Sequence, residues 1–428
     1  MQEAYKILGV KAESGRWFLV ISGLIIMLCL GAIYAYSVVA VPLRKLFEAA
    51  PPEGYGLKVT STEMQIPFIV FLLVFALTMP LMGKYIEKYG PKKIALLGAV
   101  FVGLGWFLAS FATSPTTLVL LYGVIGGLGV GITYNCPIVT STRWFPDKRG
   151  LAVGLTLLGF GFSAALVGPA ADLLMAGFGI SKTLQILGVT FFVLMVLFAL
   201  PLRFPPSSWK PEGWNPQEKS AVKAAVKDIV RSELVKTRVF YALWICYTVG
   251  TLAGLMAIGV SKPVGLEVAA NAGISETEIS ALLTTLIVPF AFCNGFGRPL
   301  FGWITDKLAP RKAAAISFIL ILTASMLMLT NPASITAYVI AFAILWLNLG
   351  GWLAIAPAAT AHFFGTKDYA RNYGLVFTAY GAGALIGNLL AGQAKDVFGA
   401  YITVFQYVLA LALLGLVVAV MLKPPKQK

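Results

Sequence analysis

Residues 291–306, AFCNGFGRPLFGWITD, place an arginine in a run that is otherwise apolar or small. A charge at the centre of a membrane span costs about 2.5–3.5 kcal/mol on insertion scales, so it usually faces a cavity and has a function there. Asn294 lies one helical turn before Arg298 on the same face, and Gly295 and Gly297 let a ligand or another backbone approach closely. Because a guanidinium matches a carboxylate through two N–H donors, the pattern predicts a site in which Arg298 and Asn294 bind an organic anion.

Two alternatives for Arg298 stay open at this point, namely structural pairing and snorkelling. Arg298 precedes Asp306 by eight residues, or about 12 Å along a helix, and a long side chain can reach an interface from that depth. Arg298 is also the only Lys or Arg that we expect well inside a span. One cation matches one carboxylate better than two, since the second charge of a dianion would be unpaired in a medium of low dielectric constant.

The composition places the chain in the membrane class. Its mean hydropathy is +0.84, with 58% hydrophobic and 12% charged residues. The net charge of +15 lies between apolar spans, so we expect a lipid bilayer and no nucleic acid as partner. We expect an all-α membrane protein with twelve transmembrane helices, at 17–43, 64–86, 93–112, 117–142, 150–178, 182–202, 239–262, 277–304, 313–331, 335–361, 372–394 and 399–422.

The spans fall into two six-helix halves. We predict an N-terminal half at 1–202, a polar linker at 203–238 and a C-terminal half at 239–428. Most of the 33 Lys and Arg residues lie at the two termini, in the linker and in alternate connections. The positive-inside rule then puts both termini and the linker in the cytoplasm, as expected of a multi-pass protein of the cell's inner membrane.

The two halves repeat each other in sequence. GKYIEKYGPKK at 83–93 follows the second span and GWITDKLAPRK at 302–312 follows the eighth, and the same offset of 219 residues places Arg143 on His362. Two halves in the same orientation form a parallel repeat, an architecture in which the substrate site lies near the middle of the membrane at their interface.

The repeat also supplies an internal control for the anion site. The first-half counterparts of Arg298 and Asn294 are Met79 and Phe75. The scaffold therefore accepts apolar side chains in both places, and the second half has replaced them with a cation and an amide.

The pattern G-x-x-x-[DE]-[RK]-x-G-x-[RK]-[RK] after the second span resembles the signature of the major facilitator superfamily. A second copy follows the eighth span, with Ala309 where the signature has glycine. The resemblance covers the whole chain, and it implies that these connections gate the cytoplasmic side, with Glu87 and Asp306 as gating residues. A solvated turn between two helices is the alternative.

RWFPDKRGLAVG at 143–154, the cluster around Arg298 and ARNYG at 370–374 resemble the oxalate/formate antiporter family and the related monocarboxylate transporters. In the oxalate carriers a span-eleven lysine helps to hold a dianion, and Tyr380 occupies its place here. In animal monocarboxylate transporters an aspartate and a first-span lysine assist the arginine, and these places hold Asn294 and Val38. The resemblance therefore implies a small monocarboxylate rather than oxalate.

The same resemblance implies further residues that line the cavity. Tyrosine hydroxyls can donate to a carboxylate while the rings exclude water, although aromatic side chains in spans also serve as ordinary core. Besides Val38, the implied lining residues are Tyr34, Tyr134, Phe160, Leu349, Phe377 and Tyr380.

The sequence does not identify a proton carrier, so the mode of energy coupling stays open. When a monoanion moves inward alone, the membrane potential opposes it with a free-energy cost of about 2.3 kcal/mol per 100 mV. Co-transport with a proton removes this cost, and so does exchange for another anion. The nearest intramembrane carboxylate, Asp172, lies about 33 Å along its span from Gly150, close to the outer face.

We expect a monomeric secondary transporter of small monocarboxylates such as lactate or pyruvate, coupled to protons and working by alternating access. The alternatives are an oxalate/formate-type anion exchanger and a transporter-like substrate-sensing receptor, which would be expected to carry a large cytoplasmic extension. The four cysteines lack disulfide or metal spacing, and neither a metal-ligand set nor a nucleophile–base set suggests an enzyme, a metal or a cofactor.

Overall fold

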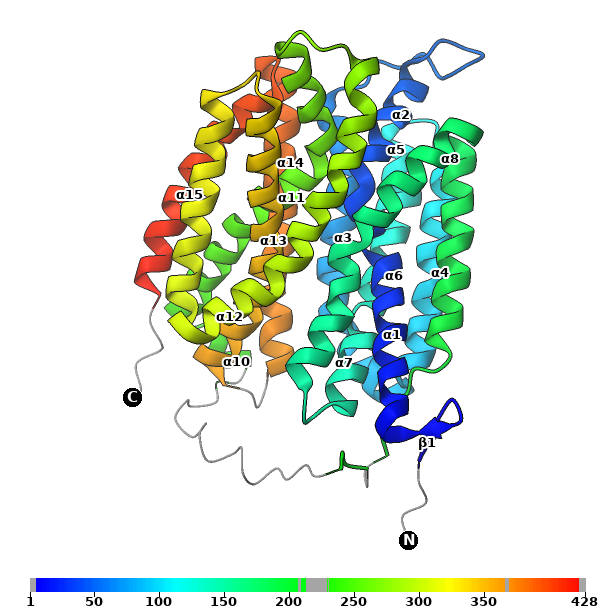
Figure 1. The fold of residues 1–428 in the computed structure, drawn as a ribbon, viewed down its shortest axis with the longest axis vertical. Coiled ribbons are helices and arrows are strands. Elements are labelled where there is room, and N and C mark those ends of the chain that lie inside the picture. Colours follow the sequence, from blue (N-terminus) through cyan, green and yellow to red (C-terminus); the bar gives the residue numbers. More distant parts are fainter. Residues whose placement is uncertain (1–4, 207–208, 213–228, 230, 366–368, 423–428) are drawn as a thin grey trace.

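The computed structural model describes residues 5–206, 209–212, 229, 231–365 and 369–422. Apart from a short antiparallel hairpin of β1 (Lys6–Ile7) and β2 (Val10–Lys11), its regular elements are helices. Long helices run side by side, and the first and last helices begin and end toward the same end of the bundle (Figure 1). We call this end the terminal end.

The first half of the chain forms five long helical segments. They are α1 (Ala12–Leu30), η1 (Gly31–Ala35) and α2 (Tyr36–Glu48); α3 (Ser61–Tyr89); α4 (Pro91–Ala109); α5 (Pro115–Leu118), η2 (Val119–Val124), α6 (Ile125–Thr133) and α7 (Asn135–Trp144); and α8 (Arg149–Ala199). The second half contains α10 (Arg231–Leu234), α11 (Arg238–Asn271), α12 (Glu276–Thr330), α13 (Ile335–Phe364), α14 (Tyr369–Phe398), η3 (Tyr401–Thr403) and α15 (Val404–Met421).

Ten of these helical segments in the described chain are long and apolar enough to cross a membrane. Two of them, α8 with 51 residues and α12 with 55, turn at Gly179 and Ala309, where φ is positive, so that each supplies two crossings. A kink at Val260 in the shorter α11 leaves it a single crossing. The predicted all-α fold with twelve crossings is thereby confirmed. Several helices run beyond their predicted ends. For example, α11 continues to Asn271, whereas the prediction ended at 262.

The turn within the signature motif has the same backbone conformation in both halves. Gly90 has φ 83° between α3 and α4, and its repeat counterpart Ala309 has φ 67° inside α12. Each is followed by a proline at the first position of the next helical stretch. Proline lacks a backbone N–H, and at this position an N–H would have no hydrogen-bond partner within the helix. The left-handed conformation costs an alanine about 1 kcal/mol relative to glycine, so the departure from the signature changes the energy and leaves the turn intact.

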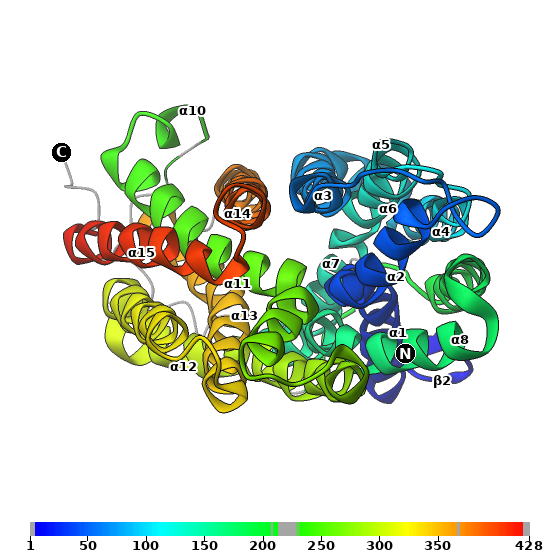
Figure 2. The same ribbon diagram turned by 90° about the horizontal axis from the view of Figure 1, so that it is seen from above.

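The two halves pack against each other through α3 with α14 and α8 with α12 (Figure 2). At the end opposite the terminal end, Lys45 Nζ lies 2.6 Å from Glu276 Oε1, and the Asp396 carboxylate accepts 2.8 Å hydrogen bonds from the backbone of Ser61 and Thr62. These contacts join the halves at that end. The predicted linker at 203–238 lies mostly outside the described residues, and the division at 202 and 239 stays a prediction.

Candidate functional site

Arg298 is buried where α12 packs against α8, with 7% of its surface exposed. Its Nη1 donates to the backbone carbonyl of Leu157 in α8, whereas Nε and Nη2 have no hydrogen-bond partner. The guanidinium carbon lies 6.0 Å from the centre of the Phe160 ring. A buried guanidinium with two free donors favours anion binding over snorkelling, because unpaired buried donors carry a desolvation cost that a bound carboxylate would offset.

Six aromatic side chains from both halves lie beside this arginine and form what we call the aromatic cluster. The cluster consists of Tyr34 (η1), Phe75 (α3), Tyr134 (between α6 and α7), Phe160 (α8), and Phe377 and Tyr380 (α14). The Tyr34 and Tyr380 hydroxyls are 2.8 Å apart, and the Phe377 and Tyr380 rings stack at 5.1 Å. The Tyr134 and Phe160 rings meet edge to face at 5.4 Å. Five predicted lining residues are thus brought together beside Arg298.

A break in the first span positions Tyr34. The chain changes from α-helix to 3₁₀-helix at Gly31, where an added Cβ would lie 2.4 Å from the backbone oxygen of Phe160. Only glycine permits this close approach of two helices. It brings the Tyr34 ring to 5.0 Å from Phe160 in an edge-to-face contact.

Phe75 belongs to the aromatic cluster, although it is not among the predicted lining residues. Its ring lies 5.1 Å from Tyr134, 5.6 Å from Phe377 and 5.9 Å from Tyr380, which places it centrally in the aromatic cluster. The signal was available, because Phe75 is the repeat counterpart of Asn294. A position that faces the site in one half faces it in the other when the halves are related by a parallel repeat.

Asn294 is fully buried, and neither its Nδ2 nor its Oδ1 has a hydrogen-bond partner. A Cβ on Gly161 of α8 would lie 3.2 Å from Oδ1, so the amide faces the opposite half one turn from Arg298. Leu349 packs closely on Gly254 of α11, and Val38 lies against the Gly168 position of α8. The contacts of Leu349 and Val38 are therefore helix packing rather than ring contacts of the aromatic cluster.

The expectation that Arg298 is the only cation deep in a span is wrong. Lys262 of α11 is 4% exposed, because the helix continues nine residues beyond the predicted end of this span. Its Nζ donates to Thr284 Oγ1 at 2.8 Å and lies 3.7 Å from Asp172 Oδ1 of α8. Asp172, expected near an interface, is 41% exposed.

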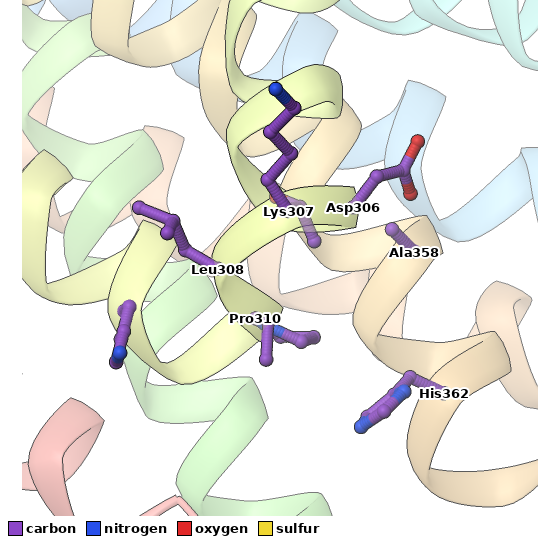
Figure 3. Close-up of a pocket in the computed structure, with 9 residues that line it drawn as sticks. Asp306, Lys307, Leu308, Pro310, Ala358 and His362 are labelled. Atoms are coloured by element: carbon purple, nitrogen blue, oxygen red, sulfur yellow. The ribbon is translucent and has the colours of Figure 1, made fainter.

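The predicted gating acids have different surroundings in the two halves. Glu87 accepts from Arg143 Nη2 at 2.5 and 2.6 Å. Their repeat counterparts, Asp306 of α12 and His362 of α13, line a pocket of about 370 Å³ at the terminal end, together with Lys307 (Figure 3). The Asp306 carboxylate points away from the imidazole of His362 in Figure 3. The acid and the base are therefore in contact in the first half, as Glu87 and Arg143, but point apart in the second half.

Comparisons with known proteins place the chain in a family. The family model described as Major Facilitator Superfamily matches residues 19–264 and 249–428. The chain is 28% identical over 422 residues to the oxalate:formate antiporter of Oxalobacter formigenes, covering 96% of this chain and 94% of that relative. It is 26% identical to monocarboxylate transporter 4 of Gallus gallus over 405 residues, 93% of this chain and 80% of the relative.

The fold is also that of a solved transporter. The crystal structure of a bacterial homologue of the human lysosomal transporter Spinster, in an inward-facing and unoccupied conformation, superposes with a TM-score of 0.67 at 16% identity. The match covers 95% of this chain and 96% of that chain, and it shows the fold alone.

The family match spans both halves, and the relatives are transporters rather than enzymes. The resemblance inferred from the signature motif and from the residues around Arg298 is confirmed. The chain belongs to the major facilitator superfamily, as a multi-pass membrane transporter related to the oxalate:formate antiporter and the monocarboxylate transporters.

Proposed function

We propose that the protein carries small monocarboxylates of the lactate and pyruvate type by alternating access, with Arg298 as the carboxylate anchor. The observation that carries the proposal is the pair of free donors, Nε and Nη2, on a guanidinium that is 7% exposed. These donors can bind both oxygens of a carboxylate in parallel. The rings of the aromatic cluster pack beside the guanidinium and would exclude water from the short organic part of the substrate.

The charge of the site favours a monoanion. The buried cations among the described residues are Arg16, Lys262 and Arg298. Arg16 is paired with Asp147 near the terminal end, and Lys262 is paired with Asp172. Tyr380, at the place of the second cation in oxalate carriers, presents a neutral hydroxyl bonded to Tyr34. A dianion would therefore keep one negative charge without a cation in a buried site, which is costly.

We further propose that the terminal end faces the cytoplasm and that one proton accompanies the substrate, which makes the moved species electrically neutral. Lysine and arginine gather at this end in the sequence, and it carries both proposed gates. The halves are joined at the opposite end by Lys45–Glu276 and by the bonds from Ser61 and Thr62 to Asp396. In this orientation the outer side is closed.

Anion exchange is a second candidate function, favoured by the similarity to the oxalate:formate antiporter over 96% of the chain. Exchange requires a countersubstrate on the other side of the membrane, whereas symport requires a proton gradient. The Tyr380→Lys variant bears on the choice of substrate, since a second cation in the aromatic cluster should shift preference from lactate toward oxalate.

The test is uptake of labelled L-lactate into proteoliposomes that contain the purified protein, with and without an inward proton gradient. Arg298→Met is the matched control, because Met79 occupies the equivalent place in the first half and the scaffold accepts it. Uptake that the gradient stimulates and the variant loses supports the proposal. Uptake that appears only when the liposomes are preloaded with anion supports exchange, and no lactate uptake in either condition refutes this substrate class.

The terminal-end acids are proposed as gates. Opening and closing of this end would alternately form and break contacts of Glu87 and Asp306, which are exposed in the present conformation. Asp306→Asn should change both the transport rate and the labelling of a cysteine introduced at the terminal end. If neither changes, Asp306 is a solvated turn residue.

A further inference from the structure

Lys262 is a buried cation that the proposed carboxylate anchor does not use. Its ammonium group is held by Thr284 Oγ1 at 2.8 Å within the second half, and by Asp172 Oδ1 at 3.7 Å across the interface between halves. Asp172 is the last acid along the fifth crossing before the break at Gly179. The pair therefore joins α8 to α11 on the side of the bundle opposite the terminal end.

Contacts on α11 and α13 connect Lys262 to the aromatic cluster. The preceding residue, Ser261, accepts a hydrogen bond at 3.3 Å from the Trp346 indole N–H. The Trp346 ring lies 6.4 Å from the ring of Tyr34, which belongs to the cluster. Lys262 thus lies between the aromatic cluster and the end of the bundle opposite the terminal end, and packed side chains connect it to the cluster.

The Lys262–Asp172 pair must change when the halves move. In alternating access the two halves rock about the central site, so contacts across the interface at one end break when that end opens. Asp172 then moves away with α8, while Thr284 stays with Lys262 in the second half. A hydroxyl does not neutralise an ammonium group, so opening of the outer side takes away the carboxylate that lies nearest to Lys262.

We propose that Lys262 is an anion-capture residue of the outer path, which attracts the incoming carboxylate when the outer side opens and which Asp172 neutralises when that side closes. This inference rests on the proposed transport of small organic anions. A cation at the mouth of a narrow path raises the local concentration of the anionic substrate. Its neutralisation by Asp172 after closure removes the attraction that would otherwise retain the substrate on the outer side.

A simple latch between the halves is the competing explanation. The two explanations predict opposite changes in the external KM when Lys262 is neutralised. If the pair only held the outer side shut, neutralising either member would favour the outward-open state and lower the external KM. If Lys262 captures the substrate, Lys262→Gln should raise the external KM about three- to fivefold, the range of one partly solvated ion pair. Asp172→Asn, which keeps the cation and removes its partner, should lower it.

The experiment measures initial uptake of labelled L-lactate by intact cells of a host that lacks its own lactate carriers, over a range of external lactate concentrations. The matched control is Lys45→Gln, because Lys45–Glu276 joins the halves at the same end but is 64% and 50% exposed. Its external KM should change less than twofold, since exposed pairs contribute little. Lys262→Arg keeps the charge and should stay close to the wild-type protein.

The capture role also predicts a dependence on ionic strength. Raising the salt concentration should reduce the difference between the wild-type protein and Lys262→Gln, because mobile ions screen a solvated charge. If Lys262→Gln is not inserted in the membrane, the double variant Lys262→Gln with Asp172→Asn also removes the carboxylate left without its partner and should show the same rise in external KM. A KM that is unchanged or lowered in the variants without the lysine overturns the capture role.

Failure of the proposed function gives a different result. If the wild-type protein takes up neither labelled lactate nor labelled formate, transport of small carboxylates is refuted, and the role of Lys262 with it. If the wild-type protein takes up either anion, Arg298→Met loses uptake and Lys262→Gln keeps its external KM, the carboxylate anchor is supported and only the capture role is refuted.

Discussion

Arg298→Lys isolates the geometry of the proposed carboxylate anchor from its charge. Nε and Nη2 are two donors held in one plane on a buried guanidinium. An ammonium group keeps the charge but offers its donors from a single nitrogen atom, so it cannot bind both carboxylate oxygens in parallel. We therefore expect the variant to retain one charge-assisted hydrogen bond to the substrate and to lose the other.

The expected magnitude follows from that single bond. A hydrogen bond to a charged group contributes about 1.5–3 kcal/mol, which corresponds to an increase in Kd of about 10- to 150-fold. The measurement is equilibrium binding of labelled L-lactate to purified protein in detergent, with Tm as the check on folding. Arg311→Lys is the matched control, since Arg311 is exposed at the turn within the second copy of the signature motif.

Two results would contradict the reasoning about Arg298. A Kd within twofold of the wild-type value, in a variant whose Tm is unchanged, would mean that the carboxylate does not bind both free donors. An equal loss of affinity in Arg311→Lys would mean that the change arises from the global effect of substituting arginine. Arg298→Met should bind no measurable lactate, because both the charge and the donors are absent.

Three further predictions concern the scaffold. Partial burial opposes ionisation of Asp147, but hydrogen bonds from Arg16 outweigh it and lower its pKa below the ordinary 3.8. The ionised carboxylate therefore stabilises the fold above the ordinary pKa, and this contribution is lost as the pH falls through the lowered pKa. Asp147→Asn should remove the contribution and flatten the dependence of Tm on pH in that acidic range. Gly350→Ala places a Cβ 1.9 Å from the backbone oxygen of Asn294, so α12 and α13 must separate, and we expect a loss of folded protein in size-exclusion chromatography. Ala309→Gly relieves a left-handed φ of 67° and should raise the free energy of unfolding by about 1 kcal/mol, measured by denaturation in detergent.

The crossings could be predicted from sequence because their determinants are local or repeated. A span is recognised by its length and hydropathy. The turn within the signature motif occurs in both halves, with the same backbone conformation at Gly90 and Ala309. Arg298 was found because a cation in an apolar run is conspicuous. Its neighbours Tyr34, Tyr134 and Tyr380 came from resemblance to a family, since an aromatic residue in a span has no distinctive pattern of its own.

The partners of the buried charges could not be predicted, because they depend on contacts between residues far apart in the chain. Lys262 was placed at the end of a span, since hydropathy falls there, and only the continuation of α11 shows that it is buried. Its partners Asp172 and Thr284 come from two other helices. The contact between Arg298 and the backbone of Leu157 spans 141 residues and likewise has no signal in either segment.

The buried cations Arg298 and Lys262 share a property that ties binding to the movement of the halves. Arg298 donates to the Leu157 carbonyl in α8, and Lys262 pairs with Asp172, also in α8. Rocking of the halves disturbs both contacts, and an isolated buried cation is costly. A carboxylate on the free donors of Arg298 would compensate its charge throughout the movement, whereas an empty site would not. Substrate binding is thus expected to lower the barrier to interconversion, so lactate should accelerate the exchange between inward-facing and outward-facing states in wild-type protein and have no effect in Arg298→Met.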